Sequence, residues 1–180
     1  MSHERPTGGV DQSEFLALVG DLRPELHRYC SRLTGSVIDG EDVVQDSLAS
    51  AFVALKTLEA APSMRAWLFR IAHNRALDHL RSRALRAAEP LEAAAETPDS
   101  EAADPLEGLM RQEAVRAAVS RFVELPIAQR SVVVLKDVLG HSLEDIAALL
   151  DTTVNAVKGH LARGRARLNR DQRAYAPTGR

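Results

Sequence analysis

Apolar residues recur at steps of three and four along most of the chain, a spacing that places them on one face of an α-helix. The first runs of this pattern predict a helix that carries the stripe from Phe15 to Leu33, and helices over residues 41–58 and 64–86. Pro24 is expected to kink the first helix or divide it in two, and Gly35 and Gly40 are expected to bracket the turn that follows. Ser63 is placed to cap the third helix, because an N-cap hydroxyl accepts a hydrogen bond from a free backbone amide.

The pattern stops over residues 87–105, which are rich in Ala, Glu and Pro and contain almost no large apolar side chain. Such a segment cannot bury enough surface to fold alone, so it is expected to be a flexible acidic linker. The periodicity returns after it. We therefore expect an all-α protein of two small helical domains, a bundle over residues 12–86 and a helix-turn-helix domain over residues 106–171. Residues 1–11 and 172–180 are expected to be a disordered lead-in and a tail.

The net charge of −2 conceals a strong segregation of sign along the chain. Residues 64–86 hold six arginines against one aspartate, a balance of +5, and residues 158–173 hold six bases against one aspartate, again +5. Between them, residues 87–107 hold seven acids and no base, a balance of −7. Two basic segments on either side of an acidic one suit a nucleic-acid partner, which the total charge alone would not suggest.

Other classes of protein find little support in the composition. The single cysteine, Cys30, excludes an internal disulfide and a cysteine-cluster metal site, and is expected to be a small buried residue. No apolar run approaches the roughly 20 residues that span a bilayer, and the first residues contain no apolar signal segment. No nucleophile with its base, phosphate-binding loop or metal cluster is recognisable. We expect a cytoplasmic protein that is not an enzyme, has no cofactor and is not inserted into a membrane.

Residues 140–170 carry the most informative pattern. Gly140 ends one helix, and Ser142 with Asp145 forms a start resembling a capping box for a short helix. Residues 151–153 then form a tight turn, and a longer basic helix begins at Val154. A short helix, a three-residue turn and a basic helix make a helix-turn-helix, whose second helix enters the major groove of DNA.

The second helix of this motif has an apolar face and an opposite polar, basic face. Asn, Lys and Arg side chains near the N-terminal end of this helix can read base edges, whereas later arginines such as Arg170 are better placed to hold phosphate. The candidate DNA-contacting residues are Asn155, Lys158, Gly159, Ala162, Arg163, Arg165 and Arg167. The alternative is a solvated basic face on an ordinary surface helix.

The segment from Leu125 to Leu168 resembles the C-terminal, promoter-reading domain of extracytoplasmic-function (ECF) sigma factors. Their recognition helix commonly reads T-V-K-S-R-L-x-R-A-R-x-x-L, and the matching residues here read A-V-K-G-H-L-A-R-G-R-A-R-L. Gly159 stands where the family has Ser, and Gly164 stands where it has Ala. The resemblance implies that the candidate residues of this helix contact the minus-thirty-five element of a promoter.

The N-terminal half resembles the other conserved domain of the same family. Residues 41–46 read E-D-V-V-Q-D, which matches the opening of the helix that docks on the clamp coiled coil of RNA polymerase. Asp42, Gln45 and Asp46 lie at positions i, i+3 and i+4, so they share one face and are the candidates for polymerase binding. The alternative is that these acids only favour a helix N-terminus.

Residues 64–83 are similar to the family's S-x-R-x-W-L-x-R-I-A-x-N-x-x-x-D-x-x-R signature. The resemblance implies that this helix handles the minus-ten element as DNA opens, with a flipped base held by the loop 59–63 and Asn74. The candidate residues are Arg65, Arg70, His73, Asn74, Arg75 and Arg81, with Arg83 adding charge. Trp67 is expected to belong to the core, and His73 and His79 to face solvent or phosphate.

Together the two resemblances imply a sigma factor that binds the polymerase core through its clamp coiled coil and flap, directs it to promoter DNA, and is held by an anti-sigma factor. One alternative is a helix-turn-helix regulator that acts without polymerase. A second is a decoy that mimics a sigma factor and titrates its inhibitor. The acidic and basic faces of the N-terminal half argue against the first, and the basic recognition face argues against the second.

Overall fold

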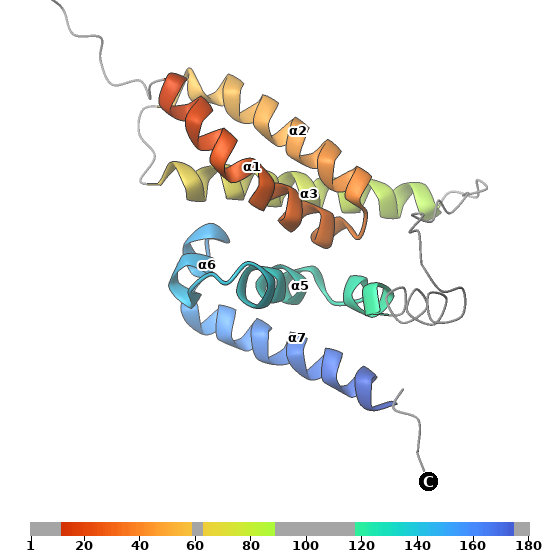
Figure 1. Ribbon diagram of the computed structural model, residues 1–180. Coiled ribbons are helices and arrows are strands. Elements are labelled where there is room, and N and C mark those ends of the chain that lie inside the picture. The colour runs from red at the N-terminus through yellow and green to blue at the C-terminus, as the bar shows by residue number, and fades with distance from the viewer. Residues whose placement is uncertain (1–11, 59–62, 89–117, 175–180) are drawn as a thin grey trace, which may run out of the picture.

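The computed structural model describes residues 12–58, 63–88 and 118–174, and the described part of the chain contains helices and no strand. Three helices, α1 (Gln12–Thr34), α2 (Val37–Leu55) and α3 (Met64–Ala88), form one layer (Figure 1). The second layer holds α5 (Ile127–Val133), the π-helical turn η1 (Val134–Val138), α6 (Leu143–Leu149) and α7 (Val154–Ala174). The two expected domains are therefore both helical, while the acidic linker lies almost wholly outside the described residues.

Helix α1 continues through Pro24, so of the two expected effects of this residue the division into two helices does not occur. Proline leaves the carbonyl four residues earlier without its helical donor, and that carbonyl belongs here to Gly20, which is exposed and open to water. The apolar face of α1 supplies much of the core of this layer. Its buried apolar side chains are Phe15, Leu22, Leu26, Tyr29, Cys30 and Leu33.

Helix α2 begins four residues earlier than the sequence predicted, because Ser36 caps it. The Ser36 hydroxyl accepts a hydrogen bond of 3.1 Å from the amide of Asp39. Gly40, expected in the turn, lies inside the helix and is buried against α1. A Cβ at this position would come within 2.6 Å of the backbone nitrogen of Ser31. Gly40 is therefore a site of close helix-to-helix contact.

This contact gives a stability prediction with an internal control. Gly40→Ala should lower the free energy of unfolding by about 1–3 kcal/mol, because two of the three obstructing atoms, Cα and N of Ser31, are backbone and cannot rotate away as its hydroxyl can. Gly20→Ala, in α1 with no atom within 4 Å of the new methyl, should raise it by about 0.5–1 kcal/mol through helix propensity. Urea unfolding followed by circular dichroism measures both. Equal effects of the two variants would contradict the close packing.

Helix α3 begins as the sequence predicted, since the Ser63 hydroxyl accepts a hydrogen bond from the amide of Ala66 at 3.2 Å. Its buried side chains are Leu68, Phe69, Ala72 and Ala76. Trp67 packs against the core, and its ring meets that of Phe15 nearly edge-on at 6.5 Å between centroids. Trp67 therefore belongs to the core, as expected.

The second layer is organised by close packing of α7 on α5. Gly164 of α7 faces α5, and a Cβ there would lie 2.9 Å from Cγ2 of Val133 and 3.4 Å from Cβ of Gln129. Gly140 has a φ of +76° and ends the segment before α6, as a glycine can without steric strain. The glycine at position 164, where the resembling family has alanine, thus allows the recognition helix to approach α5.

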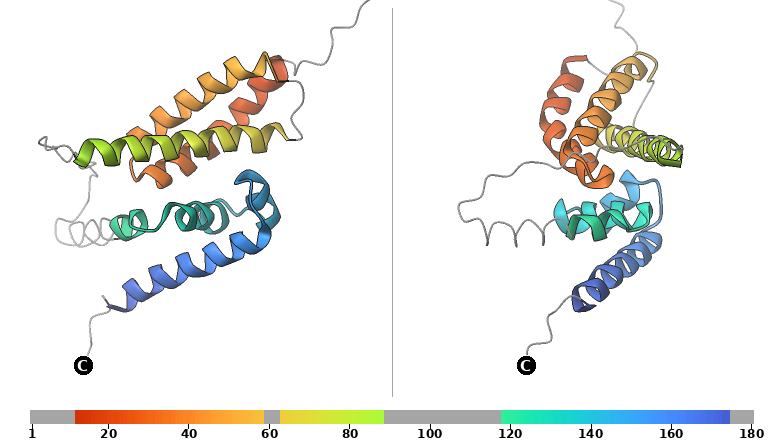
Figure 2. Two further views of the ribbon diagram at one scale, coloured as in Figure 1. Left: turned by 180° about the vertical axis from the view of Figure 1, so that it is seen from behind. Right: turned by 90° about the vertical axis from the view of Figure 1, so that its right-hand side faces the viewer.

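The two layers touch along much of their length, as two views of the ribbon show (Figure 2). Arg130 of α5 is buried and donates a hydrogen bond of 2.5 Å to the carbonyl of Leu33 at the end of α1. Gly35, just beyond that end, lies against the side chain of Val123. The described helices of the two domains therefore form one closed molecule.

Candidate nucleic-acid interface

The helix-turn-helix is built from local capping. The Ser142 hydroxyl accepts from the amide of Asp145 at 3.0 Å and starts α6. A hydrogen bond with the Ser142 side chain also lowers the pKa of the Asp145 carboxyl, which completes the expected box. Asp151 adopts a φ of +53° in the turn, and the Thr153 hydroxyl accepts from the amide of Ala156 at 3.2 Å to start α7.

Helix α7 has the two faces that the sequence predicted. Its apolar side is buried or partly buried against α5 and α6 and consists of Val154, Val157, Leu161, Gly164 and Leu168. Its other side is exposed, and Asn155, Lys158, Ala162, Arg163 and Arg167 all lie on it, with Gly159 half-buried among them. Helix α7 lies on the side of the second layer that faces away from α1, α2 and α3, so its exposed side can approach a groove (Figures 1 and 2).

Two of these candidates have intramolecular neighbours that bear on their role. The guanidinium of Arg163 lies over Gly159, where a Cβ would be 3.2 Å from Nη1. Arg165 forms an ion pair with Asp137 of η1, with one hydrogen bond from Nε to Oδ2 at 3.0 Å. Hydrogen bonding to Asp137 raises the pKa of Arg165. Arg163 lies within the first three turns of α7 and packs over Gly159, whereas the side chain of Arg165 is held against η1 by Asp137.

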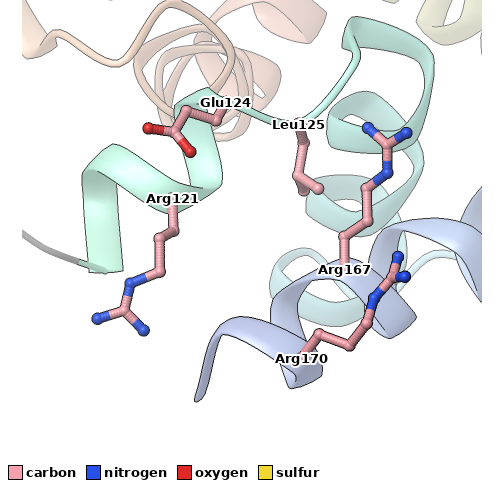
Figure 3. A pocket seen from close by; sticks show the side chains of 5 residues that line it. All are labelled: Arg121, Glu124, Leu125, Arg167 and Arg170. Atoms are coloured by element: carbon pink, nitrogen blue, oxygen red, sulfur yellow. The ribbon is translucent and has the colours of Figure 1, made fainter. Parts of the chain in front are cut away.

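A pocket of about 390 Å³ lies near the C-terminal half of α7. Arg167 and Arg170 line it from α7, and Arg121, Glu124 and Leu125 line it from the segment before α5 (Figure 3). Arg167 and Arg170 place two guanidinium groups on this part of α7, whereas the guanidinium of Arg121 points away from them (Figure 3). This end of the helix is suited to holding an anionic backbone.

Helix α2 presents the expected polar face. Asp42, Gln45 and Asp46 are all exposed, while Val44 on the opposite side is fully buried. Glu41, beside them, accepts a hydrogen bond of 3.0 Å from Nε2 of Gln45 and pairs with Arg23 of α1. The hydrogen bond from Gln45 is the largest cause of the lowered pKa of Glu41.

Helix α3 carries the arginines of the basic segment at residues 64–86, and most of them contact polar side chains. Arg75 donates to the Ser50 hydroxyl at 2.7 Å, and Arg81 pairs with Asp78 at 3.1 Å. Arg83 likewise reaches Asp39 of α2 at 3.2 Å. Arg65, Arg70 and Asn74 are exposed as well. The loop 59–63 that would lie beside Asn74 falls outside the described residues except for Ser63.

His73 departs from its expected position. It is half-buried, and its Nδ1 lies 2.8 Å from the hydroxyl of Tyr29, a fully buried residue of α1. Burial lowers the pKa of His73 and raises that of Tyr29. His73 therefore lies partly against the core, and its contact with DNA stays a prediction.

The structure adds two residues that the sequence did not single out. Glu25 of α1 contacts both Arg65 of α3 and His141, which precedes α6. Arg70 also lies 3.6 Å from Asp151 in the turn of the helix-turn-helix. The sequence carries no signal for this cluster, because Glu25 and His141 are 116 positions apart.

Neither a metal site nor a membrane span emerges from the part of the chain that the structure describes. Within it, no three His, Cys, Asp or Glu residues are grouped so that they could hold a metal ion. None of its helices is long and apolar enough to cross a membrane. Cys30 is buried and free, and burial raises the pKa of its thiol to about 12, so it behaves as a core residue.

Two family models match the chain in order. Sigma-70 region 2 matches residues 18–86, and Sigma-70 region 4 matches residues 115–168. The first match covers α2, nearly all of α3 and most of α1, and the second covers α5, η1, α6 and α7 as far as Leu168.

Curated proteins with sigma-factor names are similar to this chain over most of its length. The chain is 32% identical over 160 residues to the ECF RNA polymerase sigma factor SigM of Mycobacterium tuberculosis, covering 89% of this chain and 78% of that protein. It is 36% identical to the RNA polymerase sigma factor CnrH of Cupriavidus metallidurans, covering 73% and 72%. SigG of M. tuberculosis is 33% identical, and the chain spans about half of its length, 48%.

Solved structures show the same arrangement of helices. CnrH in complex with the cytosolic domain of CnrY has a TM-score of 0.67 and 31% identity, over 92% of both chains. The sigma factor RpoE of Bartonella quintana, in complex with the anti-sigma factor NepR, has a TM-score of 0.66 over 91% of this chain and 99% of that one. At 23% identity the second likeness concerns the fold alone.

Proposed function

Because the chain belongs to the ECF RNA polymerase sigma factor family, we propose that it binds the polymerase core and directs it to promoters. The polymerase performs the chemistry of RNA synthesis, and this chain supplies recognition, so we assign it no catalytic residue. Its place of action would be the cytoplasm, where the polymerase works.

One observation carries the proposal: a single chain presents an exposed acidic face on α2 and an exposed basic face on the second helix of a helix-turn-helix. An acidic face suits an arginine-bearing partner helix, and the basic face suits DNA. A regulator that acts without polymerase has no use for the first face. A decoy for an anti-sigma factor has no use for the second.

In this proposal Asp42, Gln45 and Asp46 bind the clamp coiled coil of the polymerase, and the second domain, residues 106–171, meets the flap. Helix α3 handles the minus-ten element, with the exposed Asn74 holding an unstacked base beside the loop before α3. The arginines Arg65, Arg70, Arg75 and Arg81 attract the separated strand. His73, half-buried and 2.8 Å from the Tyr29 hydroxyl, lies among them.

An anti-sigma factor is a further proposed partner. The solved structures of CnrH and RpoE hold CnrY and the anti-sigma factor NepR, respectively. Exposed apolar residues on α2 of this chain, Val37, Ile38 and Val53, offer surface for such a partner. We propose an inhibitor that covers surface of the N-terminal layer.

In α7, Lys158 and Arg163 lie near the front of the helix and would read bases of the minus-thirty-five element, whereas Arg170 would hold phosphate. Arg163→Ala should relax the preference at one or two base positions by roughly 1–3 kcal/mol. Arg170→Ala should weaken binding to all sequences alike and reduce the salt slope by about one. The measurement is binding of the assembled holoenzyme to a library of single-base promoter variants at two salt concentrations.

Core polymerase alone and the wild-type holoenzyme are the controls of this experiment. The holoenzyme should prefer one minus-thirty-five sequence, and core alone should show no preference. A holoenzyme with no preference would overturn the proposed function. A uniform loss of affinity in Arg163→Ala, with preferences unchanged, would overturn only the assignment of this residue.

A further inference from the structure

Gly159 lies in the first half of α7, half-buried on the side of the helix that is proposed to face DNA. Glycine is a poor helix former, so a glycine inside a helix lowers its stability unless something nearby requires the missing side chain. For Gly164, the other glycine of α7, that requirement comes from α5. At Gly159 the three atoms nearest to an added Cβ all belong to the guanidinium of Arg163. Gly159 therefore bears on the placement of Arg163.

The side chain of Arg163 lies back along α7, over the turn that precedes its own Cα. Its Nη1, Nη2 and Cζ would be 3.2, 3.4 and 3.7 Å from a Cβ at position 159. The direction follows from helix geometry, because Cα–Cβ bonds tilt towards the N-terminus and place residues i and i+4 on one face. Non-bonded carbon atoms pack best at about 3.5–4.0 Å. A methyl group at position 159 would therefore push the guanidinium away from the helix.

A long hydrogen bond steadies the guanidinium in this place. Nη2 of Arg163 lies 3.4 Å from Nδ1 of His160, and the ring nitrogen accepts because a guanidinium can only donate. Arg165, by contrast, directs both Nε and Nη2 at the carboxylate of Asp137. The side chain of Arg163 remains exposed, and a guanidinium has five N–H donors. Arg163 therefore keeps donors for a partner outside the protein.

The position of this guanidinium decides which base it can read. Arginine recognises guanine in the major groove with two parallel N–H groups, one on O6 and one on N7. Lying over Gly159, the fork of Arg163 is carried towards the N-terminal end of α7, and this end of a recognition helix contacts base edges. The exposed neighbours Ala162 and Ala166 are short, so they do not hold the fork away from a groove. A displaced fork would keep its charge but lose the paired contact.

We propose that Gly159 determines sequence specificity by leaving room for the Arg163 guanidinium, which lies over it and reads a guanine of the minus-thirty-five element. The proposal rests on the proposed function of α7. Gly159 acts through Arg163 and needs no contact of its own with DNA. A side chain at this position makes the helix more stable and the reading of the base poorer.

The contact is tested first without DNA, by nuclear magnetic resonance of the full-length protein. The Nε–H resonance of Arg163, identified by its absence in Arg163→Lys, should shift in Gly159→Ala because the methyl group displaces the guanidinium. The resonance of Arg167, one turn further along, should stay in place. Gly159→Ala should also unfold at a higher urea concentration than the wild type, so a loss of base reading in this variant is not a loss of folding. An unmoved Arg163 resonance would overturn the contact.

The reading is tested with assembled holoenzymes on a library of single-base variants of the minus-thirty-five element. The wild type should favour guanine at the position read by Arg163 by about tenfold, and Gly159→Ala should reduce this preference to about threefold. Added to Arg163→Ala, which has no guanidinium to displace, the same substitution should change the preference no further. Gly20→Ala is the matched control, because no atom lies within 4 Å of the new methyl, and it should keep the wild-type preference.

Two results would overturn the proposal and leave the proposed function standing. One is a guanine preference that is unchanged in Gly159→Ala. The other is an equal effect of Gly159→Ala with and without Arg163, since Gly159 would then meet DNA by itself. A wild-type holoenzyme that prefers no sequence would instead overturn the proposed function, and the reading of guanine by Arg163 would fall with it.

Discussion

Replacing Asp42, Gln45 and Asp46 together with alanine should weaken binding of the protein to core polymerase by about 100-fold, or roughly 3 kcal/mol. All three side chains are exposed on α2, and the neighbouring Glu41 is already paired with Arg23. The loss follows because partner arginines would be left without acceptors in the complex. Fluorescence anisotropy of the labelled protein titrated with core polymerase measures it.

A matched triple variant separates docking from general charge. Gln12, Glu14 and Asp21 are exposed on α1, and replacing them with alanine removes the same two carboxylates and one amide. This control should keep its affinity within about twofold, since long-range charge effects are screened at moderate salt. Equal losses in the two triple variants, or no loss in the first, would overturn the docking face on α2.

Arg130→Met should lower the free energy of unfolding by about 3–5 kcal/mol. The buried guanidinium donates hydrogen bonds to three carbonyls, those of Leu33, Val123 and Leu125. Methionine fills similar space but leaves these acceptors without a donor in a closed interior. Because the Leu33 carbonyl lies at the end of α1, the variant should also uncouple the two domains.

Two probes measure this uncoupling. Trp67, the single tryptophan, reports on the first layer by fluorescence, and circular dichroism reports on all helices. Urea transitions from the two probes should coincide in the wild type and separate in Arg130→Met. Arg28→Met, at an exposed position of α1, should change stability by no more than about 0.5 kcal/mol. A change equally small in Arg130→Met would contradict the bridging role of Arg130.

The positions of the helices and their buried and exposed faces could be predicted from the sequence, because they depend on local spacing and on capping residues. Ser63 and Ser142 start their helices as expected, and α7 buries Val157 and Leu161 while exposing Lys158 and Arg163. These features are decided within one or two helical turns. The same reasoning gave the exposed acidic face of α2 correctly.

Errors arose where a distant residue decides the outcome. Gly40 looks like a turn residue, yet its role is set by the backbone of Ser31 on another helix. His73 looks like a solvent-facing polar residue, yet it is half-buried with its Nδ1 2.8 Å from the hydroxyl of Tyr29 on another helix. No local pattern distinguishes such residues from their exposed neighbours.

The contact between the two domains could not be predicted from the sequence either. It depends on Arg130 meeting the Leu33 carbonyl and on Glu25 meeting His141, pairs that are 97 and 116 positions apart. Each contact joins residues of ordinary type with no repeated spacing. Only the folded chain reveals that a carboxylate of the first domain occupies an arginine proposed for DNA.

Mapping of transcription start sites tests the central claim most directly. Purified core polymerase, with or without this protein, would transcribe fragmented genomic DNA of the source bacterium, and the RNA 5′ ends would be sequenced. We expect starts that appear only with the protein and share upstream minus-ten and minus-thirty-five sequences, with the preference at minus thirty-five relaxed by Arg163→Ala. The same scattered starts with and without the protein would contradict the assignment of this chain as a promoter-directing sigma factor.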